Sequence, residues 1–335
     1  MLDLLSTASI ALVFAVSFFV TFAAIPIIGR IMRKHGITGK DVHKLGRNEL
    51  PEMCGLAILI GLTVGLAIYT IIFPNAMRET AAFIGTVLIA GAIGLVDDLR
   101  PLSARIKPLL TAVACIPILL LGTYDPFPII PFVGPVRFTI IYPLMIPVAL
   151  AVTSNAVNMM DVMNGAMAGT VSIISVAIAA ILLVTGRTET AALAVGLLAA
   201  LLAFYYFNRY PAKVFGGDTG SLAVGAALGA LAILGRIETV VVVALIPHIM
   251  NAFYGLASVG RLYERHEIRQ RPTELLKNGN LQASAEGNAP ITLARIILAA
   301  GQLGEREIVR GMIILTIISS ILAVLTFGIT LVGRI

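Results

Sequence analysis

Long apolar stretches separated by short polar segments make up most of this sequence. A membrane-spanning helix needs about 20 mostly apolar residues, and by that criterion the pattern predicts about ten spans. They lie near residues 8–29, 54–73, 80–96, 108–122, 139–157, 166–185, 189–207, 219–235, 239–260 and 311–333. We therefore predict an all-α integral membrane protein in which residues 1–335 form a single polytopic membrane domain.

The composition supports a membrane protein and excludes an ordinary soluble domain. Of the 335 residues, 58% are hydrophobic and 13% are charged, whereas soluble domains carry roughly 25% charged residues. The two cysteines, Cys54 and Cys115, lie in apolar surroundings, which favours buried free thiols over a disulfide or a metal pair. We expect membrane lipids, and no nucleic acid, among the partners.

The basic residues lie mainly on one side of the predicted topology. With ten spans, loops 30–53, 97–107, 155–165, 208–218 and 261–310 share a side and hold 19 of the 24 lysines and arginines. Basic residues concentrate in cytoplasmic loops, so we expect this side to face the cytoplasm and both termini to face outward. The long cytoplasmic loop 261–310 is expected to carry a surface helix around residues 289–303, and the turn-rich outer segment 123–138 a small hairpin.

Carboxylates gather at span ends on the same predicted side, at Asp97, Asp98, Asp161 and Asp218. Acids at membrane level are costly and usually functional. Asp97 and Asp98 are adjacent, so they repel each other unless a cation neutralises them, and Lys107 follows shortly after. This pattern favours a phosphate or metal site, with a salt-bridged helix end as the structural alternative.

Asp218 lies among small residues in the segment 215–221, just before a long apolar run. Glycines let backbone approach a ligand closely, and a helix beginning near Thr219 would direct free N–H groups at the same point. A carboxylate beside such amides suggests a Mg²⁺–phosphate site. The alternative is a helix start with Asp218 or Thr219 as its N-cap.

Asn155, Asn158 and Asp161 recur at a spacing that places them close to one helical face. Their oxygens are hard ligands that suit Mg²⁺, and Asn164 with Gly165 forms a turn signal that exposes backbone amides. The alternative is hydrogen bonding between packed membrane helices.

Other polar residues are weaker candidates. Glu52 begins the second span, where an acid either binds substrate or only stabilises a helix start. Arg269 and Arg271 alternate in an extended segment, so both point the same way and suit pyrophosphate oxygens, with lipid headgroups as the alternative ligand. His248 lies inside an apolar segment and is interpreted as a hydrogen-bonded interior histidine.

Together these residues resemble the polyprenyl-phosphate N-acetylhexosamine-1-phosphate transferases, which are polytopic membrane enzymes with ten spans. The resemblance rests on three signatures in matching order: Asp97-Asp98 with Lys107, residues 155–165, and residues 215–221. The run 207–211 and a last loop with a single histidine resemble the archaeal and eukaryotic branch, which acts on UDP-N-acetylglucosamine and dolichyl phosphate. Asp161 instead resembles the bacterial pattern.

By position, the resemblance implies that Asn158 and Asp218 hold Mg²⁺, with Mn²⁺ as the alternative ion, against the sugar-nucleotide pyrophosphate. It implies that Asp97 and Asp98 lie where the lipid phosphate attacks. The remaining matched residues would bind phosphates, sugar or nucleotide, and Phe215 and Asn164 would sit against the uracil. The implied catalytic set is Asp97, Asp98 and Lys107, and the implied substrate-binding set is Glu52, Asn155, Asp161, Asn164, Phe215, Arg269 and Arg271.

The expected activity is therefore a Mg-dependent glycosyl-1-phosphate transfer. N-acetylglucosamine-1-phosphate would move from UDP-N-acetylglucosamine to a polyprenyl (dolichyl) phosphate with release of UMP, and a homodimer is the candidate assembly. One alternative is the same reaction with another UDP-N-acetylhexosamine donor, as in bacterial cell-wall or polysaccharide initiation. The other is a nucleotide-sugar transporter, whose site would lie near the bilayer midplane rather than at span ends.

Overall fold

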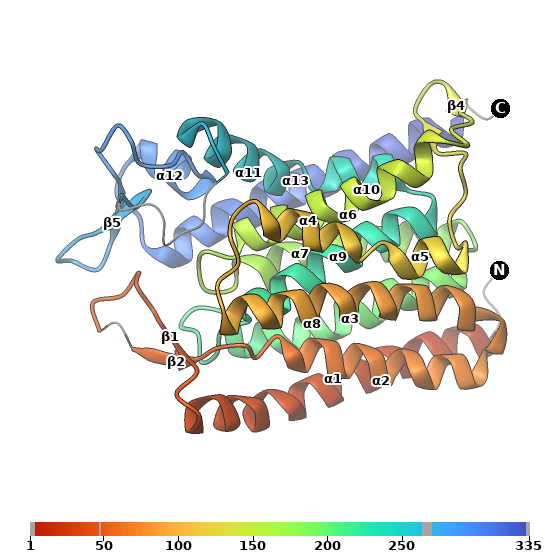
Figure 1. The fold of residues 1–335 in the computed structure, drawn as a ribbon, viewed down its shortest axis with the longest axis horizontal. Helices are drawn as coiled ribbons and strands as arrows, with labels where there is room; N and C mark the ends of the chain where they lie inside the picture. Colours follow the sequence, from red (N-terminus) through yellow and green to blue (C-terminus); the bar gives the residue numbers. More distant parts are fainter. Residues whose placement is uncertain (1–3, 47, 263–269, 333–335) are drawn as a thin grey trace.

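α-Helices make up most of the chain in the computed structural model, which describes residues 4–46, 48–262 and 270–332 (Figure 1). The α-helices are α1 (Leu4–Lys34), α2 (Leu56–Ile72), α3 (Met77–Leu99), α4 (Ile106–Val113), α5 (Ile116–Leu121), α6 (Ile141–Met160), α7 (Ala166–Val184), α8 (Thr188–Asn208), α9 (Gly217–Gly235), α10 (Glu238–Ala244), α11 (Ile246–Val259), α12 (Leu293–Ile297) and α13 (Glu305–Val332). Short 3-10 turns cover Pro74–Ala76 and Leu298–Ala300.

Three antiparallel pairs of short strands complete the described chain. They are β1 (Thr38–Lys40) with β2 (Glu49–Pro51), β3 (Ile129–Ile130) with β4 (Gly134–Pro135), and β5 (Thr273–Leu275) with β6 (Leu281–Ala283). The β3–β4 pair confirms a small hairpin in segment 123–138. The surface helix expected around 289–303 is shorter than predicted, because only α12 and the 3-10 turn after it are helical there.

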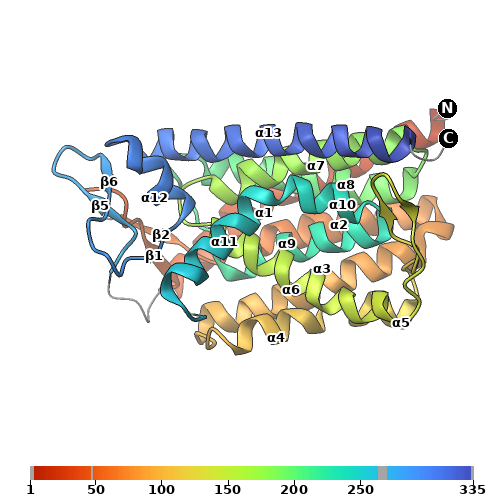
Figure 2. The same cartoon turned by 90° about the horizontal axis from the view of Figure 1, so that it is seen from above.

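Helix α9 forms the centre of the bundle and is the element around which the others pack (Figures 1 and 2). Its apolar stretch is 89% buried, against 22% for α1 and 28% for α13. It is rich in glycine and alanine, and small residues let membrane helices approach closely. At Gly94 of α3, an added β-carbon would lie 2.3 Å from the carbonyl oxygen of Asp218. This contact sets the end of α3 directly against the start of α9.

The outer helices carry the side chains expected of a lipid-facing surface. Large apolar residues such as Phe19, Ile71 and Leu120 are 66%, 78% and 82% exposed. Seven helices within the described chain are long and apolar enough to cross a membrane, or eight if the bent pair α10–α11 is one span. The protein is therefore an integral membrane protein, as predicted. Helix α2 and the pair α4–α5, two of the ten predicted spans, are shorter.

Prolines account for the two broken helices. The α10–α11 pair bends by 64° just before Pro247, and α4 ends shortly before Pro117. Proline lacks the N–H that would continue the helical hydrogen bonds. The apolar pattern alone shows neither break, because residues 108–122 and 239–260 each form a continuous apolar run.

The two ends of the bundle differ. Helix α1 begins and α13 ends at the same end, which also holds the β3–β4 hairpin (Figures 1 and 2). The β1–β2 and β5–β6 hairpins lie at the opposite end. The last turn of α3 and the first turn of α9 lie toward this second end, where the predicted site residues gather.

Candidate active site

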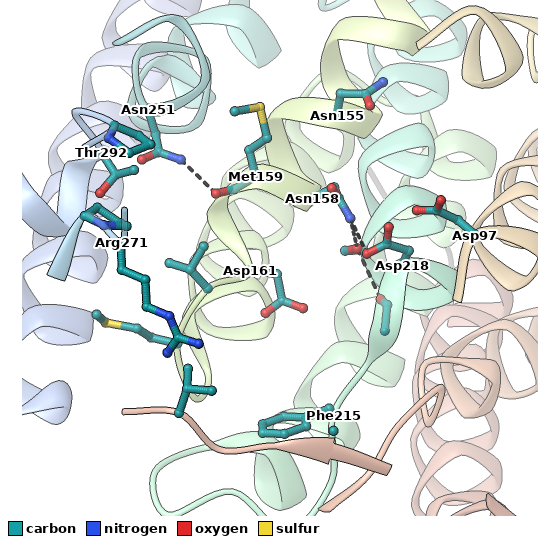
Figure 3. Close-up of a pocket in the computed structure, with 18 of the residues that line it drawn as sticks. Asp97, Asn155, Asn158, Met159, Asp161, Phe215, Asp218, Asn251, Arg271 and Thr292 are labelled. Atoms are coloured by element: carbon teal, nitrogen blue, oxygen red, sulfur yellow. Dashed lines mark hydrogen bonds between the residues drawn. The ribbon is translucent and has the colours of Figure 1, made fainter. Parts of the chain in front are cut away.

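One cavity of about 880 Å³ brings together eleven of the twelve predicted site residues. It is lined by Glu52, Asp97, Asp98, Lys107, Asn155, Asn158, Asp161, Asn164, Phe215, Asp218 and Arg271. The twelfth, Arg269, lies outside the described residues. The prediction that segments far apart in sequence share one cavity is confirmed. Figure 3 shows Asp161 and Arg271 reaching into its open centre, with Asp97 and Asp218 on one wall and Phe215 on another.

Lys107 is the charged centre of one wall. Its Nζ lies 2.6 Å from Asp97 Oδ2 and 2.8 Å from Asp218 Oδ2. Asp97 also accepts a 2.6 Å hydrogen bond from the Leu102 N–H at Oδ1, which folds the chain after α3 back toward α4. The side chains of Lys107 and Asp97 are 6% and 5% exposed, whereas Asp218 is 30% exposed. The Asp97–Lys107 pair is therefore buried beneath an Asp218 carboxylate that remains open to the cavity.

Asp98 caps helix α9 across the bundle. It accepts hydrogen bonds from the N–H groups of Asp218 (2.7 Å) and Thr219 (2.9 Å) and from the Thr219 hydroxyl (2.6 Å). The first N–H groups of a helix lack partners within it and attract anions. The cap is thus supplied by a residue from α3, whereas a local cap by Asp218 or Thr219 was the alternative drawn from sequence. Asp98 fixes where the Asp218 carboxylate stands.

Asn158 joins α6 to the same carboxylate. Its Nδ2 donates to Asp218 Oδ1 and to Ser221 Oγ, both at 2.8 Å (Figure 3). Asn155, one turn earlier, donates instead to Thr111 Oγ1 of α4 at 2.9 Å. Asp161 lies just beyond the end of α6, so the three residues do not share one helical face, although all three line the cavity.

Asp161 faces the cavity from the α6–α7 connection (Figure 3). Burial, together with the negative charge of Asp218, raises the pKa of this carboxyl to about 7. The Met167 N–H, which donates a hydrogen bond to it, acts in the opposite direction. Asp161 is therefore a carboxyl group that changes charge near neutral pH.

The far wall is built from segments that meet through buried hydrogen bonds. Asn208, which is 3% exposed, accepts from the Gly165 N–H at 3.1 Å and donates to the Val214 carbonyl at 3.0 Å. These bonds hold the Asn164–Gly165 turn against the segment that carries Phe215. The Phe215 ring and the Glu52 carboxylate both pack against Gly39, where an added β-carbon would lie 3.1 Å from each.

Sequence reasoning missed three buried residues around this wall, Asp41, Asn208 and Glu305, and the half-buried Lys44. Glu305 begins the last apolar helix, which is the same signal that selected Glu52. Asp41 and Lys44 lie in a polar loop where nothing in the local pattern marks them as buried. Asn208 ends an apolar helix, and its partners are visible only in the folded chain.

His248 is an interior residue that forms a hydrogen bond, as interpreted from the sequence. It is fully buried, and its Nε2 lies 3.0 Å from the Thr170 hydroxyl. Cys54 and Cys115 are buried free thiols, as predicted.

Comparison of the sequence with known proteins identifies the family of this chain. Residues 80–236 match glycosyl transferase family 4. A Saccharolobus solfataricus protein named as a UDP-N-acetylglucosamine–dolichyl-phosphate N-acetylglucosaminephosphotransferase is 32% identical over 270 residues, which cover 76% of this chain and 84% of the relative. The chain belongs to glycosyl transferase family 4. It is accordingly a membrane transferase, and the resemblance drawn from its motifs is confirmed.

Bacterial relatives of this family 4 transferase reach the same level of identity. A Bacillus subtilis protein named as an undecaprenyl-phosphate N-acetylglucosaminyl 1-phosphate transferase is 32% identical over 71% of this chain and 66% of its own length. A Desulforamulus reducens phospho-N-acetylmuramoyl-pentapeptide-transferase is 34% identical over 68% of this chain and 74% of its own length. The family match spans Asp97, Lys107, Asn158 and Asp218.

Proposed function

We propose that this protein transfers N-acetylglucosamine-1-phosphate from UDP-N-acetylglucosamine to a polyprenyl phosphate, of which dolichyl phosphate is the favoured form, and releases UMP. The observation that carries the proposal is Lys107 held between Asp97 and Asp218 in a cavity at one end of a membrane bundle. A fixed ammonium there suits the phosphates of donor and acceptor. The names of the relatives support the donor and the acceptor class.

We propose Mg²⁺ as the cofactor, with Asp218 and Asn158 as the residues that would hold it. The Asn158 amide nitrogen is engaged by Asp218 and Ser221, which leaves its Oδ1 available, and Asp218 is the most exposed member of the charged group. Among the described residues, no cluster of three or more His, Cys, Asp or Glu side chains could hold a metal. The donor set still fits Mg²⁺, which binds through one or two carboxylates, water and substrate phosphates. When bound, the ion would offset the charge on the diphosphate oxygens.

In the proposed reaction, an oxygen of the lipid phosphate bonds to the β-phosphorus of the donor, and the bond from that phosphorus to the departing UMP breaks. A phosphate monoester has its second pKa near 6, so this nucleophile is largely ionised at neutral pH. A strong general base is not required. Asp97 orients Lys107, and Lys107 holds the phosphate oxygens in place. Asp98 acts through α9, because its oxygens are occupied by the helix start.

A covalent aspartyl-phosphate route is the competing mechanism. It would require Asp97 to leave Lys107 and attack the donor. The two routes differ in one observable, because only the covalent route releases UMP before acceptor is added. If Asp218→Ala no longer released UMP without acceptor, that release would be shown to come from the same site.

We also propose ten membrane crossings with the cavity facing the cytoplasm. Successive helices run alternately between the two ends of the bundle (Figures 1 and 2), which supports counting α2 and α4–α5 as spans. The basic loops lie at the cavity end, as expected of a cytoplasmic face. Labelling of a cysteine placed at exposed position 40 from either side of sealed vesicles tests the orientation.

The function is tested by mixing purified protein with Mg²⁺, polyprenyl phosphate and a panel of nucleotide sugars, followed by mass spectrometry. We expect UMP and a lipid-linked diphosphosugar with UDP-N-acetylglucosamine as the preferred donor. Preference for another UDP-N-acetylhexosamine would favour the bacterial type of reaction. A donor that crosses vesicle membranes unchanged, with no lipid product, would identify a transporter instead.

A further inference from the structure

Asn164 is held from two sides by carboxylates that the proposed reaction does not use. Its backbone N–H donates to Glu305 Oε1 at 2.8 Å, and its Nδ2 donates to Asp41 Oδ2 at 3.1 Å. Lys44 binds the same Asp41 oxygen and lies 3.8 Å from Glu305 Oε2. Asp41 and Glu305 are each 4% exposed. Two distant segments, the loop with Asp41 and Lys44 and the start of α13, therefore converge on Asn164, and Asp41 is the one that contacts its amide side chain.

The contact with Asp41 fixes which way the Asn164 amide points. An ionised carboxylate only accepts hydrogen bonds, so the NH₂ group of the amide must face Asp41. A flipped amide would set its carbonyl oxygen against the carboxylate and lose a charge-assisted bond. Within the described part of the chain, Oδ1 has no protein partner. Asn164 lines the cavity, so Oδ1 as acceptor and the second N–H of Nδ2 as donor are the amide groups with which a ligand there would pair.

An aromatic face lies near this polar edge. Asn208 ties the Gly165 N–H to the Val214 carbonyl, so Asn164 and Phe215 belong to adjoining turns that line the same cavity. Stacking on an aromatic ring combined with an amide edge is a common way of recognising a nucleobase. The orientation of the edge then decides which base fits.

We propose that Asp41 is a positioning residue that makes the site select uracil over cytosine, by holding the Asn164 amide in one orientation. Uracil offers an N3–H donor to Oδ1 and a carbonyl acceptor to the Nδ2 hydrogen. Cytosine has the reverse pattern, with an unprotonated N3 and an exocyclic amine, and pairing with it would require the flipped amide. The inference rests on the proposed function for its uridine donor.

The test measures how strongly UMP and CMP inhibit the transfer, and the ratio of kcat/KM for UDP- and CDP-N-acetylglucosamine. In Asp41→Asn the neighbouring amide can either donate or accept, so Asn164 is free to turn. We expect the uridine preference to fall at least about tenfold, because cytosine no longer leaves buried polar groups unpaired. Most of this change should appear in KM for the cytidine donor, with kcat for the uridine donor little affected.

Glu305→Gln is the matched control. It disturbs the same Lys44 network but contacts the backbone N–H of Asn164, so it should change kcat/KM for both nucleotides alike and leave their ratio unchanged. An Asp41→Asn enzyme with an unchanged ratio would overturn the proposal, as would a ratio that falls equally in Glu305→Gln.

A measurement on the unmodified protein keeps the proposal testable if Asp41→Asn does not fold. UMP should inhibit more strongly than both CMP and N3-methyl-UMP, and equal inhibition by the three would overturn the role of the amide. If the unmodified protein forms no lipid product with any donor, the proposed function fails. If it forms product without discriminating between the bases, only the inference about Asp41 fails.

Discussion

Replacing Lys107 with methionine should destabilise the protein and abolish transfer for two separable reasons. The substitution keeps an unbranched side chain but removes the charge that neutralises Asp97, which is 5% exposed and lies 2.6 Å from Nζ. Breaking a buried ion pair by removing one partner costs about 3–5 kcal/mol. Asp218 adds less to this cost, because it is 30% exposed and can be solvated.

At about 2 °C per kcal/mol, we expect Tm to fall by about 6 °C or more, measured in detergent without Mg²⁺ or nucleotide. We expect kcat to fall by about 10²–10³-fold, as when a stabilising donor is removed from the site of charge development. The double variant Asp97→Asn with Lys107→Met should regain most of the lost Tm, since no unpaired buried charge remains. It should regain none of the activity. A single variant with unaltered Tm would contradict the buried Asp97–Lys107 pair, and a double variant with restored turnover would contradict the role of Lys107 in transfer.

Three other substitutions test other parts of the site. Asp98→Ala removes the cap of α9 and should cost about 2 kcal/mol of stability, seen as a lower Tm, and reduce kcat. The raised pKa of Asp161 means that the folded protein loses stability as pH rises from the ordinary pKa of an aspartate through about 7. Asp161→Asn should therefore increase the free energy of unfolding at pH 8 by up to about 4 kcal/mol, seen as a higher Tm, and change it little at pH 4. Equal effects at both pH values would exclude this titration. Gly94→Ala forces α3 away from α9 and should abolish activity, whereas Gly328→Ala, which meets no atom within 4 Å, should not.

The spans and the site could be predicted from sequence because both depend on local patterns. Runs of about 20 apolar residues identify membrane helices, and acids at their ends are rare enough to mark a site. Asp97 and Asp218 were found in this way and Asn158 by its spacing from Asn155 and Asp161, and the structure places all three in one cavity. The order of their motifs then identified the family.

The rest depends on contacts between distant segments, which no local pattern contains. Asp98 caps a helix that begins 119 positions later, at Gly217, whereas the local sequence offered Asp218 and Thr219 for that task. Asp41 and Glu305 lie far apart in the chain and come together only in the fold, around Asn164 and Lys44. Pro247 marks the α10–α11 bend, but the apolar run around it looks the same whether its helix is straight or bent.

The most direct test of the account follows the β-phosphate of the donor. UDP-N-acetylglucosamine labelled with ³²P at the β-position is mixed with Mg²⁺, polyprenyl phosphate and the protein, and the lipid and aqueous products are separated. The proposed reaction carries the label into the lipid fraction and releases unlabelled UMP, and both products should be lost in Asp218→Ala. Labelled UDP in solution beside an unlabelled glycolipid would contradict it, because the sugar would then have been transferred without its phosphate.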